Sequence, residues 1–238
     1  MIDWNKQLFS YCERALDPSF WAEPVNAFSN VAFLLAALAA LNLWLRQPAT
    51  DRRFIDLGLI TILVAIGVGS FLFHTYATVW AVLTDVIPIT VFMLVYLACA
   101  LKRFMGLGWI ATAAGVVVFY LALQQAEALR CGAGPCLNGS LGYVPALLAL
   151  LIVGGLVKFG AHPAGQSLIA AGLIFAVSLT LRTIDRTICD ATDPGFGHGP
   201  IGTHSMWHVL NAALLYILIR ASILYGTFSK TVDRGLAR

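Results

Sequence analysis

Long apolar runs separated by short polar segments dominate the chain. A membrane-spanning helix needs about 20 mostly apolar residues, because a rise of about 1.5 Å per residue must cover roughly 30 Å of hydrocarbon. The uncharged run between Asp56 and Asp85 is too long for one helix, and the segment 74–77 divides it into two. The pattern therefore predicts seven spans, located within residues 23–46, at about 55–75, at about 79–101, within 103–127, at about 140–158, from about 164 into 182–189, and at about 203–225.

The composition strengthens this prediction. Of the 238 residues, 59% are hydrophobic and 11% are charged, and the mean hydropathy is +0.82, which is typical of an integral membrane protein. No linker, charge block or long polar insert divides the sequence, so we expect residues 1–238 to form one all-α domain, a seven-helix bundle. The net charge of +3 is small, and no basic stripe is interleaved with aromatic residues, which argues against nucleic-acid binding. Nothing in the sequence indicates an obligate protein partner. The partners that the composition predicts are the surrounding membrane lipids.

The distribution of Lys and Arg predicts the orientation. With the N-terminus outside, ten of the 15 Lys and Arg residues fall on the cytoplasmic side, as the positive-inside rule favours, and the C-terminus is then cytoplasmic. The polar start, residues 1–6, lacks the basic and apolar parts of a cleavable signal peptide, so we expect the mature chain to begin there. The compact chain and its short loops favour a bacterial inner membrane, with the outer helix ends towards the periplasm.

Four of the five cysteines lie on the predicted outer side, and Cys99 lies in the third span. An oxidising exterior would allow one bridge between Cys131 and Cys136 and another between Cys12 and Cys189, whereas the alternative is that some or all of them stay reduced. No Cys-x-x-Cys spacing is present, so a zinc ribbon or a thioredoxin-like motif is not expected.

Five polar residues are predicted to gather near the outer ends of the helices. Ser70 and His74 are four residues apart and share one helical face, and so do His204 and His208 at the start of the seventh span. Asp85 opens the third span across a short turn from His74. Ionisable groups at membrane depth are costly and usually face the bundle interior, so each is a candidate functional residue.

These residue types fit metal-assisted hydrolysis. Three neutral imidazoles can hold zinc and leave a fourth tetrahedral position for water, whose pKa zinc lowers to about 7. Asp85 could then act as general base and acid, and Ser70 could donate a hydrogen bond to the oxyanion that forms when a carbonyl is attacked. The constellation of His74, His204 and His208 with Asp85 and Ser70 therefore predicts a hydrolase that works at the membrane interface.

Structural interpretations of the same residues stay open. A histidine pair alone could be an interface feature or a haem ligand set, and Ser70 could be a small packing hydroxyl beside Gly67 and Gly69. Asp85 could simply be a helix N-cap. His162 and His198 fall in predicted loops, so we do not expect them to be metal ligands.

Arg182 and Asp185 are three residues apart near the outer end of the sixth span. At this spacing we expect them to form a structural salt bridge with each other, and the alternative is that they close the site around the metal ligands.

Motifs spread over nearly the whole chain carry a family resemblance. They are Tyr11-Cys12-Glu13, the segment from Trp21 to Asn30, Gly69-Ser70-Phe71-Leu72-Phe73-His74 with Asp85, Arg182-Thr183-Ile184-Asp185, and His204-Ser205-Met206-Trp207-His208. Together they resemble the alkaline ceramidase family, seven-helix membrane hydrolases within a superfamily that also holds the adiponectin-receptor type proteins. The resemblance implies that His74, His204 and His208 hold zinc, that Asp85 acts on the metal-bound water and that Ser70 stabilises the oxyanion. The implied reaction cleaves the amide of ceramide into a sphingoid base and a fatty acid.

The resemblance has two further implications. It implies calcium binding by an N-terminal acidic cluster, for which the candidates are Glu13, Asp17 and Glu23. Ser10 and Ala15 stand where the family pattern has Asp and Asn, and the alternative is that this segment is an interfacial cap held by its cysteine and aromatic residues. The resemblance also implies a disulfide from the N-terminal segment to the end of the sixth helix, which corresponds to Cys12 with Cys189.

The leading hypothesis from the sequence is a zinc-dependent amidase acting on ceramide or a related N-acyl lipid, whose chain enters laterally between the helices. The alternative is a non-enzymatic seven-helix receptor or lipid-binding protein with a structural zinc. A haem or proton-relay protein using His74 and His208 is disfavoured, because Ser70 and Asp85 would then have no role.

Overall fold

The computed structural model describes residues 2–132, 134–189 and 200–226, so His198 lies outside the described residues. Within them, seven helical segments are long and apolar enough to cross a membrane, which confirms the predicted seven-helix bundle. The segments are Pro24–Leu45, Phe54–Tyr76, Val79–Phe104, Trp109–Ala128, Cys136–Phe159, Ala164–Ile188 and His204–Tyr225.

The seven spans contain several shorter elements. The first is divided into α1 and α2, the third ends in the π-helix η1, the fifth begins with the 3₁₀ helix η2, and the sixth ends in the 3₁₀ helix η3. A two-stranded antiparallel hairpin, β1 with β2, precedes η2. The bounds are α1 (Pro24–Ser29), α2 (Val31–Leu45), α3 (Phe54–Tyr76), α4 (Val79–Cys99), η1 (Ala100–Phe104), α5 (Trp109–Ala128), β1 (Arg130–Cys131), β2 (Gly134–Pro135), η2 (Cys136–Tyr143), α6 (Val144–Phe159), α7 (Ala164–Ile184), η3 (Asp185–Ile188) and α8 (His204–Tyr225).

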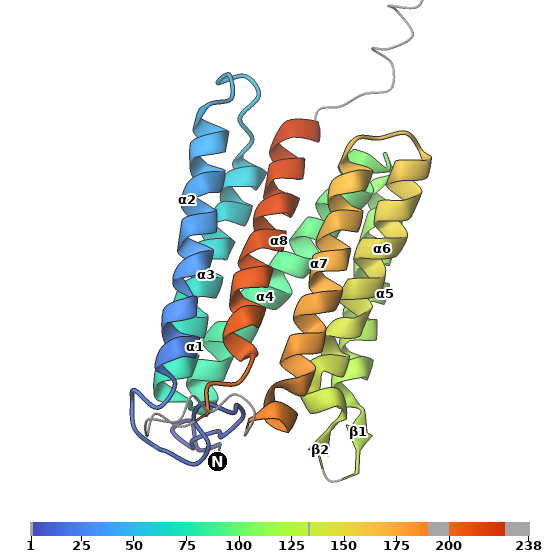
Figure 1. The fold of residues 1–238 in the computed structure, drawn as a ribbon. Helices are drawn as coiled ribbons and strands as arrows, with labels where there is room; N and C mark the ends of the chain where they lie inside the picture. Colours follow the sequence, from blue (N-terminus) through green and yellow to red (C-terminus); the bar gives the residue numbers. More distant parts are fainter. Residues whose placement is uncertain (1, 133, 190–199, 227–238) are drawn as a thin grey trace, which may run out of the picture.

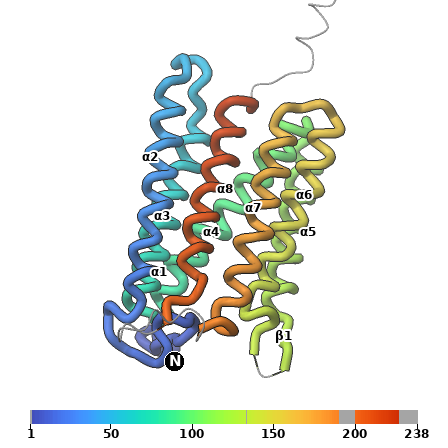
Figure 2. Tube along the Cα trace, viewed as in Figure 1, coloured from blue at the N-terminus to red at the C-terminus, as the bar shows by residue number. Residues whose placement is uncertain are grey.

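Helix α8 occupies the centre of the bundle. It packs against α2 on one side and α7 on the other, while α3 contacts both α2 and α4, and α6 contacts α7 (Figure 1). Of the seven spans, α8 has the largest buried share. The tube view shows the N-terminal segment gathered at the end of the bundle where α8 begins (Figure 2). The last turn of α8 lies at the opposite end, as an odd number of spans requires (Figure 1).

The N-terminal segment is fixed to that end of the bundle by backbone pairing and a disulfide. Leu8 N donates to Ala77 O, 2.7 Å away, and Val79 N donates to Lys6 O at 3.1 Å, so residues 6–8 pair with the turn between α3 and α4. Disulfides join Cys12 to Cys189 and Cys131 to Cys136, the two pairings that the sequence left open against reduced cysteines. Cys99 is free and buried in α4. The segment thus covers the helix ends where the candidate residues lie.

A buried polar cluster joins α3, η1 and α8 at the end of the bundle opposite to the N-terminal segment. The carboxylate of Asp56 in α3 accepts hydrogen bonds from Arg103 in η1 and from Ser222 in α8. His162, in the turn between α6 and α7, also lies at this end, with its ring 5.1 Å from that of Phe104. It is therefore far from the other described histidines, as expected of a loop residue.

Helices α3 and α4 approach closely at Gly69. A Cβ atom at this position would collide with the backbone carbonyl of Thr84, whose own hydroxyl donates to Gly69 O at 3.3 Å. This contact brings the face of α3 that carries Ser70 next to the turn of α4 that carries Asp85. Glycine at position 69 is therefore a packing requirement of the site.

We expect Gly69→Ala to lower the free energy of unfolding by about 1–3 kcal/mol, because the added methyl forces the two helices apart. Gly58→Ala in the same helix is the matched control, since nothing lies within 4 Å of its added Cβ. Thermal unfolding in detergent would compare the two variants with the wild-type protein. Equal midpoints for both variants would contradict the close approach.

Candidate metal centre

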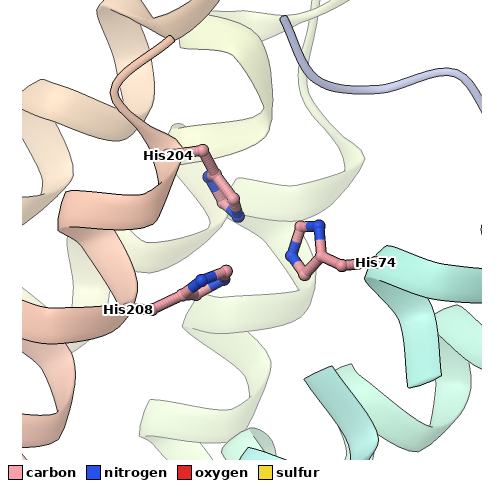
Figure 3. Close-up of side chains that lie close together, drawn as sticks. All are labelled: His74, His204 and His208. Atoms are coloured by element: carbon pink, nitrogen blue, oxygen red, sulfur yellow. The ribbon is translucent and has the colours of Figure 1, made fainter. Parts of the chain in front are cut away.

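Three buried histidines point towards one another between α3 and α8. His74 comes from the last turn of α3, and His204 and His208 come from the first two turns of α8 (Figure 3). Each offers a ring nitrogen, and these nitrogens all lie within 4.8 Å of one another. The three residues are only 1–2% exposed. The predicted face sharing of His204 with His208 thus brings both rings opposite His74.

Hydrogen bonds at Nδ1 orient two of the three histidine rings. His74 Nδ1 lies 2.6 Å from a carboxylate oxygen of Glu23, and His208 Nδ1 lies 2.7 Å from the hydroxyl of Ser29. Tyr11 stacks on the third ring, that of His204, with 3.7 Å between the ring centroids. A histidine that binds a metal through one ring nitrogen usually forms a hydrogen bond through the other, as Nδ1 of His74 and of His208 does here. The hydrogen bond fixes the tautomer and the ring orientation.

The electrostatics of Glu23 suit this role. Burial alone would raise the pKa of Glu23, but the hydrogen bonds from His74, Arg14 and Asn26 hold that pKa below its usual range. Glu23 is therefore a carboxylate at neutral pH, and it can accept the Nδ1 proton of His74. This leaves Nε2 of His74 as the free acceptor on the inner side of the ring.

Buried ring nitrogens without partners test whether this set fits a metal. Among the described residues, His74 Nε2 and His204 Nδ1 have no hydrogen-bond partner, although both are buried. Burying a polar atom without a partner is costly, and a bound ion is one of the explanations for such atoms in a native structure. The three imidazoles therefore fit a metal ion that they would hold together.

Ser70 and Asp85 lie beside the histidines. Ser70 is buried, and its hydroxyl is 3.4 Å from Nε2 of His208. Asp85 lies close enough to His74 and Ser70 to interact with both, and its buried Oδ1 has no hydrogen-bond partner among the described residues. Thr78 is the N-cap of α4, so the interpretation of Asp85 as an N-cap is wrong. All five residues selected from the sequence thus converge from three helices.

Comparison with known proteins gives the family. A sequence model of the ceramidase family matches residues 9–234, nearly the whole chain. The chain belongs to the ceramidase family. Membership implies a hydrolase that acts on amide bonds and a lipid substrate of the ceramide type. No curated protein sequence matches the chain at a significant level.

Arg182 and Asp185 of this ceramidase-family protein do not form the predicted salt bridge. Asp185 is fully buried and accepts hydrogen bonds from the backbone N–H groups of Cys12, Thr203 and His204, at 3.0, 2.7 and 2.9 Å. The prediction of a pair was wrong because the start of α8 and the N-terminal segment supply unpaired N–H donors that compete for this carboxylate. Asp185 consequently fixes the backbone that carries His204.

Arg182 instead faces η2 and the aromatic residues below the histidines. Its guanidinium donates to Asn138 O at 3.0 Å and to the hydroxyl of Ser140 at 3.1 Å. It also lies over the rings of Tyr143 and Trp207, 5.2 and 5.5 Å from their centroids. Because Trp207 precedes His208, this contact supports the first turns of α8.

The three carboxylates that were candidates for calcium do not converge. Glu13 accepts the backbone N–H groups of Val25 and Asn26 at the start of α1, at 2.7 and 2.8 Å. Asp17 is exposed and binds the backbone and hydroxyl of the nearby Ser19. In the part of the chain that the structure describes, only the three histidines form a group with metal-ligand geometry. The carboxylates of this segment therefore do not fit a calcium ion.

Several contacts of the site were not predicted from the sequence. Glu23 was considered only as a calcium ligand, yet it orients His74, and Ser29 had no predicted role although it orients His208. Both belong to the motif between Trp21 and Asn30, which was the only available signal. No local spacing rule connects residue 29 with residue 208.

Proposed function

We propose that this protein hydrolyses the amide bond of ceramide or a related N-acyl lipid at a zinc ion held by His74, His204 and His208. The products are a fatty acid and an amino lipid, which is a sphingoid base when the substrate is ceramide. The observation that carries the proposal is the group of three inward-facing imidazoles, two of which have a buried ring nitrogen without a hydrogen-bond partner. Three neutral imidazoles with one open position are the usual ligand set of catalytic zinc. Zinc bound there supplies a Lewis acid that polarises the amide carbonyl and activates water.

Asp85 and Ser70 perform the remaining steps. The Asp85 carboxylate, with one oxygen free, accepts a proton from the attacking water and passes it to the nitrogen of the leaving amine. The Ser70 hydroxyl donates a hydrogen bond to the oxyanion that forms when the carbonyl is attacked. One water is consumed, its oxygen enters the carboxylic acid, and its two hydrogens are divided between acid and amine.

An apolar cavity beside the histidines supports a lipid substrate. It lies among the helices α2 to α8. Phe33, whose ring centroid is 6.1 Å from that of His208, lines the end near the site, and Leu218 lines it two to three turns further along α8. The lining is almost entirely aliphatic and aromatic, so the cavity suits a hydrocarbon chain whose amide lies at the histidines.

Filling this cavity is expected to discriminate between substrates by chain length. Ala149→Phe places a ring in the cavity wall, so we expect kcat/KM for N-palmitoyl sphingosine to fall about tenfold, a loss of about 1.4 kcal/mol. An N-hexanoyl substrate should be little affected. Ala113→Phe, on the exposed face of α5, is the control. Equal losses for both chain lengths would argue that the cavity does not hold the acyl chain.

The proposed function is tested on the detergent-purified protein. Zinc is measured by mass spectrometry, and release of palmitate from N-palmitoyl sphingosine is followed by chromatography. We expect one zinc per chain and hydrolysis that is lost when zinc is removed and restored when it is added back. Metal-free protein with undiminished hydrolysis would overturn the zinc mechanism, and zinc-loaded protein inactive on every N-acyl lipid tested would overturn the amidase.

A further inference from the structure

Arg14 is the largest fully buried side chain of the described residues, with 1% of its surface exposed. Its guanidinium lies between the N-terminal segment and the end of α3. All of its hydrogen-bond acceptors are oxygen atoms, one from a carboxylate and four from backbone carbonyls: Nε donates to Glu23 at 2.6 Å, Nη1 to Asp17 O and Ser19 O at 3.1 and 2.9 Å, and Nη2 to His74 O and Thr75 O at 2.9 and 3.2 Å.

The number of these contacts matches the side chain. A guanidinium carries five N–H donors and no acceptor, and the five contacts account for all of them. Calcium also prefers carboxylate and carbonyl oxygens as ligands, and one carboxylate oxygen and four carbonyl oxygens surround this guanidinium. The oxygen-lined space is thus of the kind that holds a cation, and here a side-chain cation fills it.

The same guanidinium reaches the candidate metal centre by two routes. One route runs through Glu23, whose first carboxylate oxygen binds Arg14 and whose second lies 2.6 Å from His74 Nδ1. The other route is direct, because Arg14 also binds the backbone carbonyl of His74. Arg14 therefore fixes both the ring and the backbone of one metal-binding histidine.

A divalent ion would meet unfavourable conditions in this place. The other two carboxylates considered as calcium ligands already have partners. Glu13 binds the start of α1, and Asp17 binds Ser19 in solvent. Glu23 already neutralises the positive charge of Arg14. A calcium ion needs six to eight oxygen ligands and would have to displace a fully bonded guanidinium to obtain them.

We propose that the Arg14 guanidinium takes the place of a calcium ion in this protein. It organises the N-terminal segment against α3, acts as a positioning residue for His74, and makes folding and metal binding independent of calcium. The calcium part does not depend on which lipid is hydrolysed, whereas the positioning part assumes that His74 binds the proposed zinc.

The first test uses the wild-type protein in buffers freed of calcium by a chelating resin, because soluble chelators would also remove zinc. We expect the same thermal unfolding midpoint, and the same zinc content, without calcium and with millimolar calcium. Calorimetry should show no calcium binding. A midpoint that rises with calcium but not with magnesium would overturn the proposal, and this measurement requires neither a substrate nor a variant.

The second test changes the charge at position 14. Arg14→Gln should weaken zinc binding about tenfold or more, as removal of a group that orients a ligand does, and lower the unfolding midpoint. Arg14→Lys, which keeps the charge but not the five-donor fork, should recover part of both losses. Arg130→Gln, at an exposed arginine of β1, is the matched control. Unchanged zinc affinity in Arg14→Gln would overturn the positioning role.

The third test asks whether the space becomes a cation site once the guanidinium is removed. Arg14→Glu places a second carboxylate beside Glu23 and the four carbonyl oxygens, so we expect this variant to be less stable without calcium and to gain several degrees in its midpoint when calcium is added. Magnesium should do less, because it demands a smaller octahedral cage. If calcium stabilises Arg14→Glu no more than it stabilises Arg14→Gln, the space is not a cation site and the proposal fails.

Discussion

Replacing His208 by alanine is expected to remove the bound metal and to reduce amide hydrolysis to the background rate. His208 supplies one of three buried ring nitrogens that lie within 4.8 Å of one another, and the remaining pair would leave a bound ion with two open positions. The substitution also leaves the hydroxyl of Ser29 without its 2.7 Å contact. Zinc content and palmitate release, measured on the same preparation, should fall together.

The control for this result is another histidine. His162 is also buried, but it lies at the opposite end of the bundle, where its Nδ1 accepts the N–H of Ala164 at the start of α7. His162→Asn keeps an acceptor for that N–H and should retain zinc and hydrolysis. Full zinc occupancy in His208→Ala would show that the metal is held elsewhere, whatever the effect on activity.

The number and placement of the spans could be predicted from the sequence because burial in lipid imposes a simple rule on length and polarity. Hydropathy does not reveal how a span is divided, and the first one is interrupted at Asn30, whose side-chain amide donates to the carbonyls of Asn26 and Ala27. This division separates the short α1, which carries Asn26 and Ser29 at the site, from the longer α2.

The membership of the site could be predicted because residues four apart share a helical face, which placed Ser70 with His74 and His204 with His208. That rule is local, and so it does not tell which helices face each other across the bundle. It also failed for Arg182 and Asp185, since a three-residue spacing favours an ion pair only where no stronger partner competes. Here three backbone N–H groups bind Asp185.

Arg14 could not be placed from the sequence at all. Its contacts join it to residues 60 and 61 positions away, and nothing in the segment 10–17 distinguishes a buried arginine from an interfacial one. Ser10 and Ala15 replace the acidic and amide residues of the family pattern, which indicated only that the set of calcium ligands was incomplete. The structure adds that a guanidinium occupies the space between the neighbouring carbonyl oxygens.

Replacing Asp85 by asparagine is expected to separate catalysis from metal binding. Asparagine has nearly the same shape, and Asp85 is not one of the three residues that form the metal-ligand group, so zinc should be retained in full. Hydrolysis should nevertheless fall by about 10²–10⁴-fold, because an amide cannot accept the proton of the attacking water and return it to the leaving amine. The free Oδ1 of Asp85 is the atom that this argument assigns to the proton.

This variant also decides between an amidase and a non-catalytic lipid-binding protein with a structural zinc. Both hypotheses predict that Asp85→Asn retains zinc. Only the amidase hypothesis predicts that the wild-type protein hydrolyses ceramide and that Asp85→Asn loses this activity while it still binds ceramide. Asp51→Asn, at an exposed aspartate in the turn between α2 and α3, controls for the loss of a negative charge. Hydrolysis at the wild-type rate in Asp85→Asn would remove Asp85 from the mechanism, and proton transfer would then have to be assigned to another group beside the three histidines.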